Sequence, residues 1–152
     1  MGAALFDLMA IFERSPELTS RLLPVLVPAD TPEEIVAKAR TIVGTFGEGE
    51  RIAILGAHPR IGDSVRVSEL SRHEQGSDGD EKTLAELARL NDEYERRFGF
   101  RFVVFVNGRS KAEIVLVLLE RMRRSRTDEL ATGIDEFLAI SLDRLRRAER
   151  PA

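Results

Sequence analysis

Two histidines are the side chains of this sequence best suited to acid–base chemistry. His58 and His73 are its only imidazoles, and histidine alone has an unperturbed pKa close to neutral pH. His58 lies in Gly56-Ala57-His58-Pro59, where a glycine and a proline end an apolar run and hold the ring on a defined turn. We therefore predict that His58 is a catalytic group. The alternative is a histidine that packs beside the proline and has no chemical role.

A polar cluster further along the chain could line the same pocket. It consists of Ser71-Arg72-His73-Glu74-Gln75, directly before a glycine-containing turn. A Glu74 carboxylate beside His58 would favour the imidazolium and orient the ring, and Gln75 could donate hydrogen bonds to substrate carbonyls. The alternative is a solvated helix end, which we favour for His73 because its two neighbours are ordinary surface residues.

Arg144 is the third candidate, because it falls within the apolar face of a helix that we predict over residues 127–149. That face is formed by Leu130, Ile134, Phe137, Leu138, Ser141, Leu142 and Leu145, which recur at helical spacing. A buried guanidinium costs several kcal/mol to desolvate unless it pairs with a carboxylate or binds an anion. We predict that Arg144 binds an anionic substrate. The alternatives are a buried ion pair without a catalytic role and a side chain that extends to solvent at the edge of the face.

A metal site is another possible use of these side chains. It would draw on His58, Asp63, His73 and Glu74, but no two of them have the i, i+4 spacing of a specific metal-binding helix. The chain has no cysteine, which excludes disulfides, thiolate nucleophiles and cysteine-based zinc sites. We predict no bound metal and, for lack of a phosphate-binding glycine loop, no nucleotide.

The composition is that of a small globular protein. With 152 residues, 43% of them hydrophobic, the chain can close one core, so we predict a single domain over residues 1–152. The net charge of -3 gives no reason to expect a nucleic-acid partner. No apolar run approaches the roughly 20 residues that span a bilayer, and no targeting segment is evident. We expect a cytoplasmic protein that does not bind membranes.

Helix signals dominate the elements that would position these side chains. An apolar repeat predicts a first helix that ends at Ser15-Pro16, because the residue before proline is pushed out of the helical region. Thr31-Pro32-Glu33-Glu34 predicts a helix from there to about residue 46, and Ser110-Lys111-Ala112-Glu113 predicts another, because both have the pattern of a capping box. A further helix is expected over residues 84–98, ended by Gly99.

Two apolar runs are ambiguous from the residues alone. Residues 52–55 and 102–106 are rich in β-branched and aromatic side chains, which is typical of strands. However, a lone pair of strands would leave backbone groups unpaired. We therefore favour a helical bundle with short irregular segments.

Taken in order, these segments resemble the 2-oxo-4-hydroxy-4-carboxy-5-ureidoimidazoline (OHCU) decarboxylases, which complete the conversion of urate to (S)-allantoin. The resemblance covers nearly the whole chain, and the order and spacing of its motifs are specific, although each is weak alone. The motifs are Glu13-Arg14-Ser15-Pro16 (E-x-S-P), the pair His58-Pro59, Ser71 to Gln75 (S-x-x-E-Q), Phe98 to Ser110 (F-G-F-x-F and G-[RK]-[ST]), and Arg144.

The resemblance implies an all-α fold with short irregular segments around 52–63 and 100–108. It also implies a homodimer, no cofactor, and a small ureidoimidazoline as substrate. The catalytic residues would be His58, Glu74 and Arg144. The substrate-binding residues would be Pro59, Ser71, Arg72, His73, Gln75 and, through their backbone, Phe102, Val103, Val104, Phe105 and Val106.

Two positions depart from the family pattern. Arg101 stands where the family usually has proline, and Arg60-Ile61-Gly62 follows the histidine–proline pair where many members have an acidic residue and leucine. These departures bear on the details of the substrate pocket. The rival hypotheses are a non-catalytic helical interaction module and a metal-dependent hydrolase that uses His58 and His73.

Overall fold

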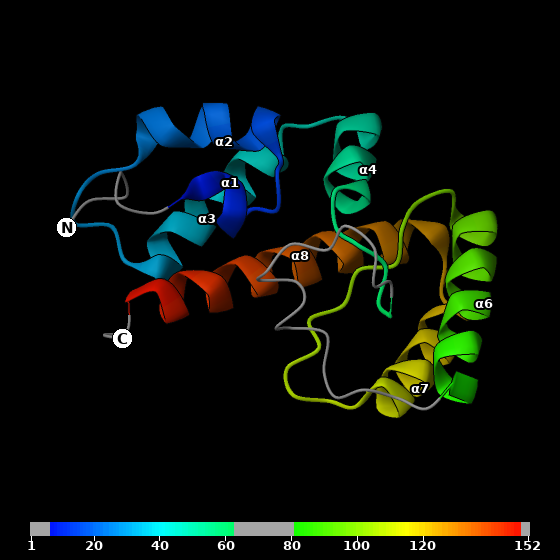
Figure 1. The fold of residues 1–152 in the computed structure, drawn as a ribbon. Helices are drawn as coiled ribbons and strands as arrows, with labels where there is room; N and C mark the ends of the chain where they lie inside the picture. Colours follow the sequence, from blue (N-terminus) through cyan, green and yellow to red (C-terminus); the bar gives the residue numbers. More distant parts are fainter. Residues whose placement is uncertain (1–6, 63–80, 150–152) are drawn as a thin grey trace.

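The computed structural model describes residues 7–62 and 81–149 (Figure 1). In these two ranges the chain forms helices and no β-strand, which confirms the predicted all-α class. The elements are α1 (Leu8–Ile11), α2 (Pro16–Leu22), the 3-10 helix η2 (Leu23–Val25), α3 (Pro32–Val43), α4 (Glu48–Gly56), α6 (Glu81–Phe98), α7 (Lys111–Arg121) and α8 (Arg126–Glu149). None of these helices is both long and apolar enough to cross a bilayer.

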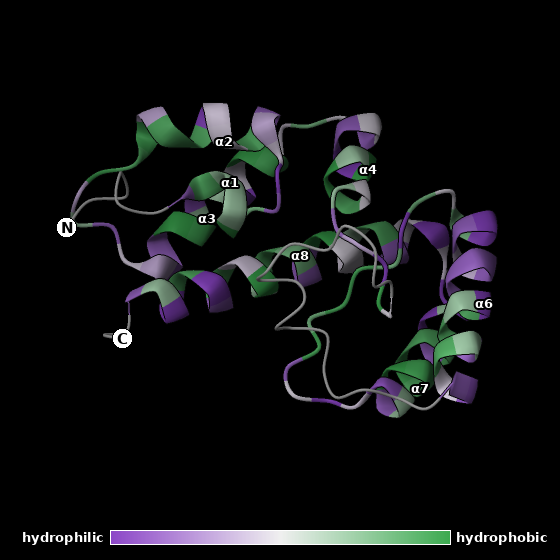
Figure 2. Cartoon of the chain, in the orientation of Figure 1, coloured by the Kyte–Doolittle hydropathy of each residue, from purple (hydrophilic) through white to green (hydrophobic). Residues whose placement is uncertain are grey.

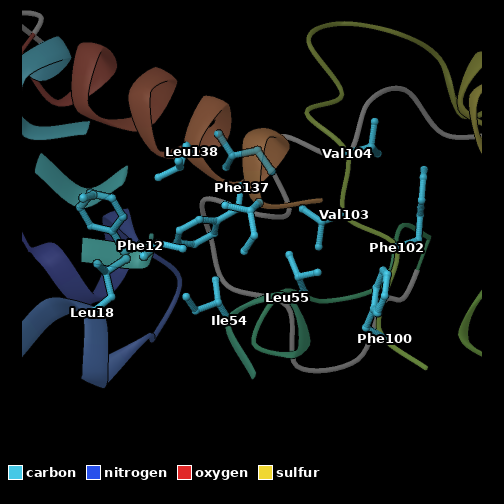
Figure 3. Close-up of a cluster of buried hydrophobic side chains, with 14 of the residues drawn as sticks. Phe12, Leu18, Ile54, Leu55, Phe100, Phe102, Val103, Val104, Phe137 and Leu138 are labelled. Carbon is cyan, nitrogen blue, oxygen red and sulfur yellow. The ribbon is translucent and has the colours of Figure 1, made fainter. Parts of the chain in front are cut away.

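The long helix α8 is the axis of the molecule (Figure 1). Helices α1, α3 and α4 all pack on it, α2 packs on α3, and α6 packs against α7. Figure 2 shows hydrophobic and hydrophilic residues alternating along α8, as expected for a helix with one buried face. The apolar side chains between α8, α1, α2, α4 and the segment after α6 form one core (Figure 3).

The helix starts predicted from capping boxes are confirmed. The Thr31 hydroxyl accepts a hydrogen bond from the Glu34 amide at 3.1 Å, and the Glu34 carboxylate accepts one from the Thr31 amide at 2.9 Å. Ser110 and Glu113 form the same reciprocal pair before α7. Gly99 follows α6 with a φ of +81°, a left-handed conformation that glycine adopts without steric cost.

Two predictions about the elements were wrong, and the helix α2 was not predicted. The first helix, α1, ends at Ile11 and not at Ser15-Pro16. Residues 52–56 belong to α4 and are not irregular; only the part of the predicted segment from 57 to 62 lacks a helix. α4 packs closely on α8. A Cβ added at Gly133 would lie 3.0 Å from Leu55 Cδ1, so glycine at this position lets Leu55 approach the helix. α2, which begins directly at Pro16, was not predicted.

The segment from 100 to 106 has neither helix nor strand, as predicted. Its backbone polar groups are instead bonded to side chains of neighbouring elements. Glu136 accepts a hydrogen bond from the Phe105 amide at 3.1 Å, and Arg121 donates one to the Val103 carbonyl at 2.6 Å. These bonds replace the ladder that a strand would need, so the segment can run through the protein in an extended form.

A buried polar cluster joins α6 and α7 to α8. Glu129, at the start of α8, is fully buried. It accepts hydrogen bonds from the Tyr94 hydroxyl at 2.5 Å, from Arg121 Nε at 2.8 Å and from Arg124 Nη1 at 3.0 Å. Burial and the bond to Glu129 raise the pKa of Tyr94, so this hydroxyl stays protonated as a donor.

Candidate active site

His58 lies on the turn that follows α4, and its side chain is buried. It is 5% exposed and stands edge-on to the ring of Phe137 from α8, with ring centroids 5.3 Å apart. Its amide donates to the Leu55 carbonyl at 3.2 Å, which fixes the turn. Within the part of the chain that the structure describes, neither ring nitrogen has a well-aligned hydrogen-bond partner, although the Ile54 carbonyl lies close enough to act on the ring. Buried imidazole nitrogens without a well-aligned partner are costly.

Arg144 is buried, as its position on the apolar face of the helix predicted. The residue is 2% exposed, so the alternative of a side chain extending to solvent is wrong. Its Nη1 donates to the Ala10 carbonyl at 2.7 Å, and its Nη2 donates to Glu13 Oε1 at 3.5 Å. The guanidinium therefore has a carboxylate partner, and that partner comes from the opposite end of the chain.

Glu13 is the site residue that sequence reasoning missed. It is 1% exposed and lies on the bend between α1 and α2, where Glu13 and Arg14 both have positive φ angles, 43° and 54°. This conformation costs non-glycine residues about 1–2 kcal/mol each, so it must be held by contacts such as the pair with Arg144. The signal that could have identified Glu13 was its place in the E-x-S-P motif.

The charges around His58 favour its neutral form. The pKa of His58 is lowered from 6.5 to about 4, first by burial and then by the positive charge of Arg144. The carboxylate of Glu13 and the carbonyl of Ile54 act in the opposite direction, and Arg101 adds a smaller lowering effect. At neutral pH the imidazole is uncharged and can accept a proton from a bound molecule.

Side chains of α6 hold the backbone that follows His58. Asn91 donates to the Ile61 carbonyl at 3.3 Å. Arg60 donates to Glu95 at 2.8 Å and to Asp92 at 2.6 Å. Arg101, the other departure from the family pattern, also pairs with Glu95. The two departures are therefore linked through one carboxylate, and both lie against the turn that carries His58.

The structure brings some of the predicted substrate-binding residues close to the centre of the molecule. Pro59 and Phe105 are half-buried, whereas Phe102, Val103, Val104 and Val106 are buried. Phe137, the ring on which His58 rests, lies between Phe12 and Val103 in Figure 3. The segment 102–106 and the His58 turn thus belong to one core.

The remaining predicted residues lie outside the described ranges. These are Ser71, Arg72, His73, Glu74 and Gln75, so their place beside His58 stays a prediction. Within residues 7–62 and 81–149, no group of three or more His, Asp or Glu side chains gathers closely enough to hold a metal ion. His73, which the hydrolase hypothesis requires, is not in those ranges.

Comparison with known proteins agrees with the motifs. Residues 3–146 match the model of the family described as OHCU decarboxylase. A 2-oxo-4-hydroxy-4-carboxy-5-ureidoimidazoline decarboxylase from Haloferax volcanii is 30% identical over 144 residues, which cover 92% of this chain and 84% of that protein. A uric acid degradation bifunctional protein from Bacillus sp. (strain TB-90) is 31% identical over 144 residues. The chain spans only 28% of the length of that Bacillus protein.

The fold has a close counterpart among solved structures. The crystal structure of an OHCU decarboxylase in the presence of (S)-allantoin superposes with a TM-score of 0.76 at 24% identity, covering 94% of this chain and 97% of that one. That likeness shows the fold, and the family match rests on the sequence. From both the motifs and the extent of the match, this chain belongs to the OHCU decarboxylase family.

Proposed function

We propose that this chain decarboxylates 2-oxo-4-hydroxy-4-carboxy-5-ureidoimidazoline to (S)-allantoin in urate degradation, without a cofactor, and that His58 transfers the proton. The observation that carries the proposal is a buried imidazole whose nitrogens have no well-aligned hydrogen-bond partner among the described residues, next to a buried Arg–Glu pair. Membership of the family supports the reaction class. The single domain and the cytoplasmic location remain predictions from the composition, and the homodimer remains a prediction from the resemblance.

The chemistry of this substrate suits a neutral imidazole. The substrate carries a carboxylate and a hydroxyl on one ring carbon, next to a C=N bond. When CO₂ leaves, the electron pair of the broken bond forms a C=C bond, the electrons of C=N move onto nitrogen, and that nitrogen takes up a proton from solvent. The hydroxyl must then lose a proton and become a carbonyl, while the neighbouring carbon gains one. An imidazole that is uncharged at neutral pH can take the first proton and deliver the second.

The other residues would bind and orient the substrate. Arg144 would stabilise the negative charge of the substrate near His58. Glu74 would orient His58 or hold the substrate hydroxyl, with the rest of Ser71 to Gln75 binding the ureido and ring polar groups. Pro59 and the backbone of residues 102–106 would line the pocket. Holding the carboxylate out of the plane of the ring is the main gain expected from such positioning.

The reaction can be tested directly. Urate is converted to the unstable substrate by the two upstream enzymes, and formation of (S)-allantoin is followed by circular dichroism with and without this chain. We expect the protein to accelerate the signal and a chelator to leave the rate unchanged. An unaccelerated signal would favour the interaction module, and loss of activity with the chelator would favour the metal-dependent hydrolase.

Replacing His58 tests its assigned role. His58→Asn keeps a polar side chain on the turn but cannot exchange a proton near neutral pH. We expect the turnover number to fall by roughly 10²- to 10⁴-fold, with far-ultraviolet circular dichroism and the urea midpoint close to those of the wild type. A folded His58→Asn protein that decarboxylates at the wild-type rate would remove His58 from the mechanism.

A further inference from the structure

Arg101 reaches from the irregular segment after α6 to the end of α4. Its Nη1 donates to the His58 carbonyl at 2.7 Å and to the Gly56 carbonyl at 3.2 Å. The last carbonyls of a helix have no partner within the helix and carry partial negative charge. The Arg101 guanidinium therefore caps α4 and at the same time bonds the peptide group of His58 itself.

Glu95 forms an ion pair with this guanidinium, without a hydrogen bond. Glu95 Oε2 lies 3.7 Å from Arg101 Nε, and the same oxygen accepts a hydrogen bond from Arg60 Nε at 2.8 Å. The three side chains are each about 30% exposed, so water screens their charges only in part. The Glu95 carboxylate thus links Arg101, which bonds the His58 carbonyl, to Arg60, which lies two residues after His58 in the chain.

From this geometry we propose that Arg101 is a positioning residue for His58. It does not touch the ring; it fixes the peptide from which the ring projects. The inference rests on the proposed function in one respect, namely that His58 is the group that transfers the proton. A turn with only its own backbone hydrogen bonds would let the imidazole swing relative to Phe137 and Arg144, and small displacements of a reacting group reduce turnover steeply.

The charge of Arg101 gives this role a second, independent readout. Three charged groups among the described residues act on the imidazole: Arg144 from α8, Glu13 from the bend after α1, and Arg101. The two guanidinium groups lower the pKa of His58, and the carboxylate raises it. Removing the positive charge of Arg101 should therefore raise the pKa of His58, whereas a lysine in its place should leave the pKa close to the wild-type value.

The experiment compares Arg101→Gln, Arg101→Lys and the control Arg96→Gln. Arg96 is an exposed residue of α6, so its replacement removes the same charge without touching the turn. For Arg101→Gln we expect kcat to fall roughly 10- to 100-fold while KM changes less than about threefold. Arg101→Lys should recover part of the loss. The pKa of His58 is measured by NMR, which is simple because the chain has only two histidines.

Two results would overturn the inference. One is an Arg101→Gln protein whose kcat and His58 pKa match those of Arg96→Gln. The other applies if Arg101→Gln does not fold, and it comes from the variant Glu95→Gln. Glu95→Gln, which leaves Arg101 itself intact, should then lower kcat, and an unchanged kcat would refute the proposal. If the wild-type chain fails to accelerate decarboxylation, the proposed function fails, whereas a wild-type rate in folded Arg101→Gln defeats only the role of Arg101.

Discussion

Three buried ionisable side chains meet at the candidate site, and their charges balance. Glu13 and Arg144 form an ion pair, and the imidazole of His58 beside them is neutral at neutral pH. A bound carboxylate would add a negative charge next to a guanidinium that is already desolvated. An Arg in such surroundings can stabilise an anion strongly, because water does not weaken the interaction. The cost is that each member of the pair depends on the other to remain buried.

Arg144→Lys should separate the binding role of Arg144 from its structural one. A lysine ammonium is a single compact charge and cannot keep the forked geometry that reaches both Ala10 and Glu13. We expect KM to rise about 10-fold or more, with a smaller effect on kcat. Arg146→Lys, an exposed position two residues further along α8 that pairs with Glu33, is the matched control. Wild-type KM in Arg144→Lys would make Arg144 a structural residue only.

At the scale of elements, local signals predicted the helices whose ends they specify. α3 and α7 begin at capping boxes, α6 ends at Phe98 directly before Gly99, and α8 has a continuous apolar face. α4 was not predicted, since its apolar residues also suit a strand and residues 52–63 were expected to be irregular. Gly133, far away in sequence, allows Leu55 of α4 to pack closely on α8.

The candidate site was predictable only in part, because some of its contacts join residues that are far apart in the sequence. His58 and Arg144 could be recognised from a turn motif and from a charge on an apolar face. The pair between Glu13 and Arg144 joins residues 131 positions apart, and no local pattern specifies such a contact. The link of Arg101 and Arg60 through Glu95 is likewise a tertiary contact. The sequence showed that Arg101 and Arg60 depart from the family pattern, but not that both contact the same carboxylate.

The polar cluster at Glu129 should be essential for holding α6 and α7 to α8. Glu129→Gln removes the negative charge that faces Arg121 and Arg124. Breaking a buried pair in this way costs about 3–5 kcal/mol, which urea denaturation would detect. Glu120→Gln is the control, because Glu120 and Arg123 form an exposed pair worth no more than about 1 kcal/mol. Equal stability of the two variants would contradict a structural role for the cluster.

For the whole molecule, the two ends of the described chain lie together on α8. Ala10 and Glu13 bond to Arg144, and Glu33 pairs with Arg146. The candidate site is therefore assembled only when the first helices dock on the last one. We therefore expect protonation of His58 to weaken the docking of these helices and to lower the stability of the fold.

The stability of the protein should therefore fall in mild acid. In the unfolded chain His58 has a pKa near 6.5, whereas in the folded protein the value is about 4. Between these two pH values the unfolded state binds more protons than the folded state. The free energy of unfolding therefore increases as the pH rises through this window and decreases as the pH falls. Urea denaturation at a series of pH values would measure the loss, expected to be a few kcal/mol at most. His58→Asn should show a smaller dependence, and an identical curve would contradict the burial of a neutral imidazole.

The uninterrupted course of α8 has a further consequence for amide hydrogen exchange. Glu129 anchors one half of the protein and Arg144 the other, with about 22 Å of helix between them at ~1.5 Å per residue. Neither half can detach without exposing a charged group whose partner stays behind in the core. Backbone amides between these two anchors should exchange with deuterium only when the whole domain unfolds, and so report its global free energy, whereas those near the helix ends exchange through local fraying.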